Sequence, residues 1–155
     1  MKLRLLFLFF LSSSYMFAAT IEDIRKLYDK AIYSEKAAEL LLQQSVISDS
    51  EKSTLNGYKA ATRMVMAKFY FNPWKKLHAF NEGKEQLEYA IQKDPENLEL
   101  IFLRLMIQLN SPSFLHYNIN VASDKKILLL SLNSIKDQDL RTRISNYLKT
   151  TERAR

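Results

Sequence analysis

Arg104 and Gln108 are the polar residues with the clearest potential for binding chemistry, because both lie in an otherwise apolar stretch. They stand one helical turn apart in residues 98–109, LELIFLRLMIQL, where nine of twelve residues are apolar. A guanidinium in such surroundings must find a partner, since burying an unpaired charge is costly. The pattern predicts either a structural partner, through an ion pair or a contact with residues 113–122, or a groove that binds an anion or a peptide carboxylate. Tyr117, within residues 113–122, completes the predicted binding set.

The motifs of common catalytic and metal sites are absent from the sequence. There is no cysteine, no HExxH motif and no Asp-rich loop, and the two histidines, His78 and His116, lie far apart. Two glycines are too few for a Gly-rich phosphate loop, and no G-x-S-x-G motif occurs. We therefore expect a non-enzymatic protein without a metal or cofactor. An enzyme would need His116 or Arg104 to open into a cleft beside a carboxylate.

Residues 98–109 predict the central helix of a small bundle. The stretch follows Asp94-Pro95-Glu96-Asn97 and stops at Asn110-Ser111-Pro112, and proline is tolerated near the first turn of a helix but not in its interior. A helix that is apolar almost all round is buried on several sides. A buried strand is the alternative, but twelve residues without alternation favour a helix.

The composition supports a single all-α domain. The chain has 155 residues, 47% of them apolar, which is enough for a packed core, while two glycines and three prolines are few for the turns of a β protein. We predict about five to six antiparallel helices. Residues 45–53 should form a polar joint, and residues 113–122 an irregular connection packed on the bundle. The expected helices span about residues 20–44, 55–71, 73–93, 98–109, 124–135 and 138–149.

Capping patterns fix several of these expected boundaries. Thr20 and Asp23 have the spacing of a capping box at the start of the first helix. Asn72 followed by Pro73 fits an N-cap and a first helical position, and residues 74–78 are expected to form either a tight turn or the first turn of that helix. Ser123 is the expected cap of the fifth helix. Gly83 interrupts the third helix, and close contact with a neighbouring helix should compensate for its low helix propensity.

Residues 1–19 are typical of a secretory signal peptide. Lys2 and Arg4 precede the apolar run LLFLFFL, and small residues at positions 18 and 19 offer a cleavage site, although the bulky residues just before them fit it poorly. We expect residues 20–155 to be a single helical domain exported by a bacterium to the periplasm or the medium. The alternative is an uncleaved N-terminal anchor, but the apolar stretch reaches only about 15 residues, and a bilayer span needs roughly 20.

The charge gives little support for a nucleic-acid partner. The formal net charge is +6, and removing Lys2 and Arg4 leaves 21 basic and 17 acidic residues, or +4. This excess predicts an ordinary solvated surface, or a weak attraction to an anionic envelope surface. Export also argues against nucleic acid as the natural partner.

Residues 80–97, FNEGKEQLEYAIQKDPEN, resemble the second helix of a tetratricopeptide repeat and the turn that leaves it. The small residue, the Leu, the Ala and the Pro of that pattern fall on Gly83, Leu87, Ala90 and Pro95. The resemblance covers about one repeat, and it implies tetratricopeptide-like helical hairpins. The looser run of residues 58–125 is also similar to small exported bacterial proteins without an assigned function.

Two functions are compatible with these features. The first is protein–protein contact with an envelope protein, through an apolar or concave surface patch. The second is a small carrier that holds a hydrophobic ligand in an internal pocket of a few hundred Å3, with Met64, Met66 and Met106 as adaptable lining. Five aromatic residues cluster near the second helix turn and serve either core packing or a partner surface: Phe69, Tyr70, Phe71, Trp74 and Phe80.

Overall fold

The computed structural model describes residues 19–45 and 48–153. In these residues the chain forms seven α-helices and three short 3-10 helices, with no β-strand. This confirms the predicted all-α class, although the helices outnumber the predicted five to six. The predicted signal peptide, apart from Ala19, lies outside the described residues. No helix in the described ranges is long and apolar enough to cross a membrane.

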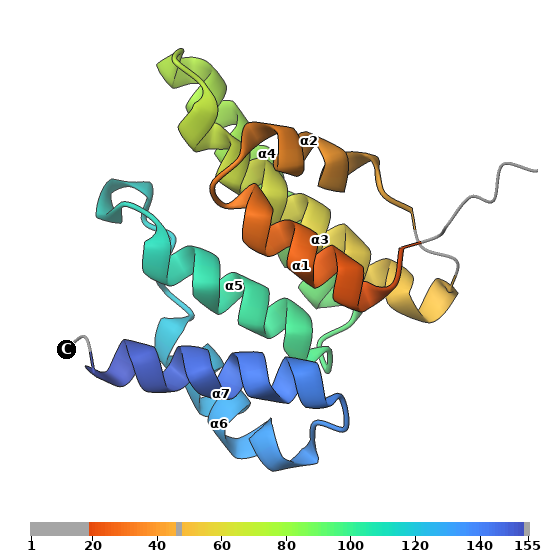
Figure 1. The fold of residues 1–155 in the computed structure, drawn as a ribbon. Coiled ribbons are helices and arrows are strands. Elements are labelled where there is room, and N and C mark those ends of the chain that lie inside the picture. Colours follow the sequence, from red (N-terminus) through yellow and green to blue (C-terminus); the bar gives the residue numbers. More distant parts are fainter. Residues whose placement is uncertain (1–18, 46–47, 154–155) are drawn as a thin grey trace, which may run out of the picture.

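The helices are arranged around α5, as the sequence predicted. Figure 1 shows α5 between the group formed by α1 to α4 and the pair α6 and α7. The α-helices are α1 (Ile21–Ala31), α2 (Glu35–Gln43), α3 (Asp49–Met66), α4 (Pro73–Lys93), α5 (Leu98–Asn110), α6 (Val121–Ser131) and α7 (Gln138–Arg153). The 3-10 helices are η1 (Ala67–Phe69), η2 (Ser113–Leu115) and η3 (Leu132–Ser134).

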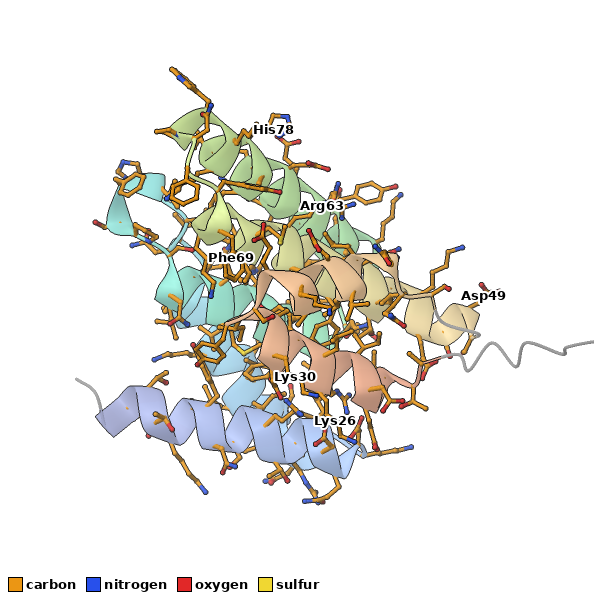
Figure 2. The ribbon with its side chains drawn as sticks, turned by 45° about the horizontal axis from the view of Figure 1, so that its top comes forward. Lys26, Lys30, Asp49, Arg63, Phe69 and His78 are labelled. Carbon is orange, nitrogen blue, oxygen red and sulfur yellow. The ribbon has the colours of Figure 1, made fainter. Side chains whose placement is uncertain are left out.

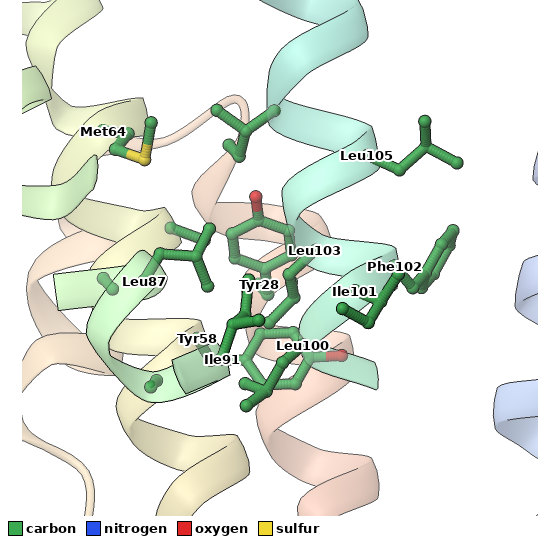
Figure 3. Close-up of a cluster of buried hydrophobic side chains, with 14 of the residues drawn as sticks. Tyr28, Tyr58, Met64, Leu87, Ile91, Leu100, Ile101, Phe102, Leu103 and Leu105 are labelled. Carbon is green, nitrogen blue, oxygen red and sulfur yellow. The ribbon is translucent and has the colours of Figure 1, made fainter. Parts of the chain in front are cut away.

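The main core forms where α5 meets α1, α3 and α4. Figure 3 shows Leu87 and Ile91 of α4 and Leu103 of α5 in one cluster with Tyr28 and Tyr58. The two tyrosine rings pack edge to face, with centroids 5.3 Å apart. Burial of this apolar surface provides the main driving force for assembling the helices.

Helices α3 and α4 form the most closely packed pair. A Cβ atom on Gly83 would lie 2.5 Å from the carbonyl oxygen of Ala60 and 2.9 Å from the backbone nitrogen of Met64. Only glycine permits this approach, so the predicted close contact at Gly83 is confirmed. The tetratricopeptide resemblance itself stays a prediction.

The predicted first helix is in fact two helices. The capping box at its start is present, with the Asp23 amide donating to the Thr20 hydroxyl. The helix ends after Ala31, however, and Ser34 adopts an extended conformation in which its hydroxyl accepts from the Ala37 amide. Ser34 therefore begins a new helix, and α2 folds back on α1.

The other helix boundaries differ from the predicted ones by less than two helical turns. Helix α3 begins at Asp49, so most of the predicted polar joint is helical, whereas α4 begins at Pro73 with Asn72 as its cap, as predicted. Helix α6 begins before Ser123, whose hydroxyl donates to the carbonyl of Asn120 instead of capping. Helix α7 continues to Arg153, beyond the expected end at residue 149.

Candidate functional site

Arg104 lies in an internal network that joins α4, α5 and α6. Its Nε and Nη2 donate to the two carboxylate oxygens of Asp124 at 2.8 and 2.7 Å, and its Nη1 donates to Glu88 at 2.8 Å. The Tyr117 hydroxyl donates to the other oxygen of Glu88 at 2.6 Å. Asp124 is fully buried. The structure thus brings Arg104 and Tyr117 together through one shared carboxylate.

The network holds its groups in fixed protonation states. Burial lowers the pKa of the Arg104 guanidinium, but the hydrogen bonds to Asp124 and Glu88 outweigh this effect and raise the pKa above its usual value. Burial, together with the bond to Glu88, raises the pKa of the Tyr117 hydroxyl. All three guanidinium nitrogens of Arg104 already have protein partners, which is the arrangement of a structural ion pair.

Gln108 lies next to this network along α5 and is only 3% exposed. Within the described residues neither its amide nitrogen nor its amide oxygen has a hydrogen-bond partner. Arg104, Gln108 and Tyr117 all lie outside the groove described below. Their role in binding stays a prediction, and an Arg104→Leu variant that folds and keeps its partners would exclude it.

A second buried network, centred on Arg25, was not predicted. Arg25 is 1% exposed, and it binds Glu99 through two hydrogen bonds of 2.7 and 2.8 Å. It also donates to Asp137 and Asp139, and the Tyr58 hydroxyl donates to Glu99 at 2.7 Å. These contacts tie α1 and α3 to α5 and to the start of α7. The available sequence signal was Glu99, an acidic residue inside the apolar stretch.

Burial and the contacts within this second network shift the pKa values of its groups. Burial lowers the pKa of Arg25, but the hydrogen bonds to Glu99 and Asp137 raise it further, so that the net shift is upward. Burial raises the pKa of Asp137, while its bonds to Arg25 and to backbone amides lower it more strongly. Burial also raises the pKa of the Tyr58 hydroxyl, and Glu99 adds to that effect. Each guanidinium nitrogen of Arg25 donates to a carboxylate of the protein, so the cluster is a structural ion-pair network that joins these helices.

An apolar groove lies at the opposite end of the α3–α4 hairpin from Asp49 (Figure 2). Its volume is about 920 Å3. Figure 2 labels Phe69 in η1 and His78 in the first turns of α4, the region that borders the groove. Tyr33, Leu77 and Phe114 line the groove and are exposed, so the groove opens to solvent. Its floor includes Tyr28, Met64, Phe80, Met106, Ile107 and Tyr147.

The groove forms because three helices end in the same region. Helix η1 ends at Phe69, and α4 starts at Pro73, where the Asn72 side chain accepts from the Trp74 and Lys75 amides. Pro112 follows the end of α5 and turns the chain so that Phe114 reaches the groove. Helix α1 ends at Ala31 and leaves the side chains that follow it at the rim.

Two lysines provide the charge of the groove. Lys68 and Lys76 line it, and none of the other lining residues is acidic. The Lys68 ammonium lies 5.5 Å from the centroid of the Tyr33 ring and 5.0 Å from that of Phe69. Burial lowers the pKa of Lys68. The groove therefore combines an apolar floor with a positive rim.

The predicted aromatic cluster divides between core and surface. Phe80 is buried and packs edge to face on Tyr117, with ring centroids 5.9 Å apart. Phe71 and Trp74 are close to Pro73 in the chain but do not line the groove, and they are 102% and 80% exposed. Of the three methionines expected to line a ligand pocket, Met64 and Met106 do so, whereas Met66 belongs to a separate small cluster.

A second depression, of about 780 Å3, lies between α3 and α4. Its lining includes lysines and Arg63 together with Asp49 and Glu85. Because both signs of charge are present, it has no clear preference for a ligand. The apolar groove is therefore the stronger candidate for a binding site.

No protein family, curated protein or solved structure matches this chain. The groove, with its apolar floor, lysine rim and exposed aromatic side chains, is the feature from which a function can be inferred. His116 is exposed at the end of η2, where its backbone adopts a left-handed conformation.

Proposed function

We propose that this protein is a non-enzymatic binding protein of the cell envelope, and that its groove holds an apolar segment of a partner protein. The location rests on the signal-peptide pattern of residues 1–19. The mode of binding resembles the general one in which a partner helix or loop inserts apolar side chains into a groove between helices. The resemblance of residues 80–97 to a tetratricopeptide repeat supports such a role, because these repeats present binding surfaces.

The exposed aromatic rim is the observation that carries this proposal. Soluble proteins rarely leave several large aromatic side chains exposed around one concavity, because their burial releases much apolar surface from water. Tyr33 and Phe114 line the groove and are 84% and 72% exposed, and Phe71 and Trp74, which are close in the chain to the lining residue Pro73, are also highly exposed. A partner segment seated there would bury them together, as aromatic anchors are buried at protein interfaces.

Gentle chemical crosslinking in an extract of the envelope tests the proposal. The wild-type protein should give one dominant protein–protein product. A Leu77→Asn variant should give at least about fivefold less of it, because Leu77 lines the groove and loses its apolar contact with the partner. Leu77 is partly exposed, so this change leaves the core intact.

Leu130→Asn is the matched control, since Leu130 is an exposed leucine on α6 outside the groove. It makes the same chemical change in a helix and should leave the crosslinked product unchanged. If all three proteins give the same product, the contact lies elsewhere and the proposal is wrong. If no product forms with the wild type, the proposal loses its basis.

A carrier of a hydrophobic ligand is the second candidate. Its specific support is the groove volume of about 920 Å3, which falls within the range of small-molecule sites, about 300–1,000 Å3. Met64 and Met106 in the lining offer adaptable apolar contacts. This function predicts a small apolar molecule on the purified monomer, and no protein crosslink that depends on Leu77.

A further inference from the structure

We infer that the partner segment is acidic as well as apolar, and that it places a carboxylate between Lys68 and Lys76 while its apolar side chains fill the groove. This inference rests on the proposed function, because it specifies the chemistry of the segment that the groove binds. It excludes a basic segment, which the lysine rim would repel.

The first support is the one-sided charge of the lining. Lys68 and Lys76 line the groove without any carboxylate among the other lining residues. The basic side chains that form ion pairs among the described residues are Arg25, Arg63, His78, Arg104 and Arg143. Lys68 and Lys76 are not among them and are exposed, so both are available to an anion from outside the chain.

The second support is the position of the Lys68 ammonium. It lies over the rings of Tyr33 and Phe69, and no carboxylate among the described residues forms an ion pair with it. Burial lowers the pKa of Lys68, which means that the charged form is partly desolvated. A carboxylate arriving with the partner would pair with this ammonium and would offset its partial loss of hydration.

The third support concerns the size of the occupant. A long-chain carboxylate would satisfy the lysines and the groove floor, but Phe71 and Trp74 lie outside the lining and would stay exposed. A protein segment that continues past Pro73 would be long enough to reach both residues, which precede and follow this proline in the chain. We therefore assign the carboxylate to an acidic side chain of a protein and not to a fatty acid.

Site-specific photocrosslinking in the envelope extract tests this inference. The crosslinking amino acid p-benzoylphenylalanine replaces Phe114, an exposed aromatic residue in the lining. Fragmentation of the product by mass spectrometry then identifies the segment bound in the groove. We expect a segment with Asp or Glu within about one helical turn of its apolar contact residue.

Charge reversal provides the decisive comparison. Lys68→Glu combined with Lys76→Glu should lower the crosslinked yield at least about fivefold, because it sets two carboxylates against the acidic segment. The control is Lys36→Glu combined with Lys149→Glu, two exposed lysines outside the groove that make the same change in net charge. This control should keep the wild-type yield.

Each outcome decides the inference. An unchanged yield after reversal of Lys68 and Lys76, or a crosslinked segment without acidic residues, overturns it. If Leu77→Asn still abolishes the product in that case, the proposed function stands and only the acidic partner is wrong. A product that contains a fatty acid, or no product at position 114, overturns both.

Discussion

Removing the buried guanidinium of Arg25 should be one of the most destabilising changes in the protein. In an Arg25→Met variant, the Glu99 carboxylate loses two hydrogen bonds and keeps only the one from Tyr58. Breaking one partner of a buried ion pair costs about 3–5 kcal/mol, because the remaining charge stays desolvated. Asp137 and Asp139 are partly exposed, so losing each of those pairs adds at most about 1 kcal/mol.

A second substitution separates two costs: leaving the Glu99 charge buried without its partner, and losing the contact with Arg25. Arg25→Met with Glu99→Leu removes both buried charges and leaves the Tyr58 hydroxyl without its acceptor, a loss of about 1–3 kcal/mol. The double variant should therefore be more stable than the single variant. Arg143→Met is the control, because its pairs with Asp29 and Asp139 are partly exposed and contribute about 1 kcal/mol or less.

Equilibrium unfolding in urea, followed by far-UV circular dichroism, measures these differences. With a slope of about 2 kcal/mol per M, a loss of about 4 kcal/mol lowers the midpoint by about 2 M. Two results would refute the reasoning that the buried Glu99 charge depends on Arg25. One is a urea midpoint of Arg25→Met within about 0.5 M of the wild-type midpoint. The other is a double variant that is less stable than the single variant.

Three further predictions concern other parts of the fold. Gln108→Met should raise the free energy of unfolding by about 1–3 kcal/mol in urea titrations. Its two amide atoms have no hydrogen-bond partners among the described residues, and methionine replaces them with an apolar side chain of similar size. A less stable variant would show that the Gln108 amide does form hydrogen bonds in the folded protein. The lowered pKa of Asp137 means that its stabilising effect is complete above the ordinary value of 3.8 and is lost as the pH falls through its folded value. Asp137→Asn should therefore be less stable than the wild type near neutral pH, and the gap should close in acid; a gap that stays constant with pH contradicts this. Gly83→Ala should destabilise by about 1–3 kcal/mol despite the better helix propensity of alanine, because its Cβ would meet backbone atoms of Ala60 and Met64; calorimetry showing an equal or higher Tm would contradict the close contact.

The central helix was predictable because local signals agree with one another. Residues 98–109 are apolar on nearly all sides, Asn97 caps their start and Pro112 follows their end, so α5 matches the prediction closely. The break between α1 and α2 was missed because the apolar spacing continues across it. Only Ser34, a good N-cap residue, signalled a new start.

The partners of Arg104 were harder to predict than its burial, and the buried pair of Arg25 and Glu99 was missed. The pattern indicated that Arg104 needs a partner, but periodicity gives the face on which a residue lies and not the residue opposite it. Arg25 and Glu99 are 74 positions apart and meet only after α1 packs on α5. The groove likewise has no motif, because it forms where separate helices end.

Native mass spectrometry of the protein purified gently from its own envelope extract tests the central claim most directly. We predict a complex of the wild-type chain with one additional protein, and an uncomplexed chain for Leu77→Asn prepared in the same way. A wild-type monomer with a small apolar adduct would favour the carrier instead. A complex that survives Leu77→Asn unchanged, or a bare wild-type monomer, would contradict the claim that the groove binds a partner protein.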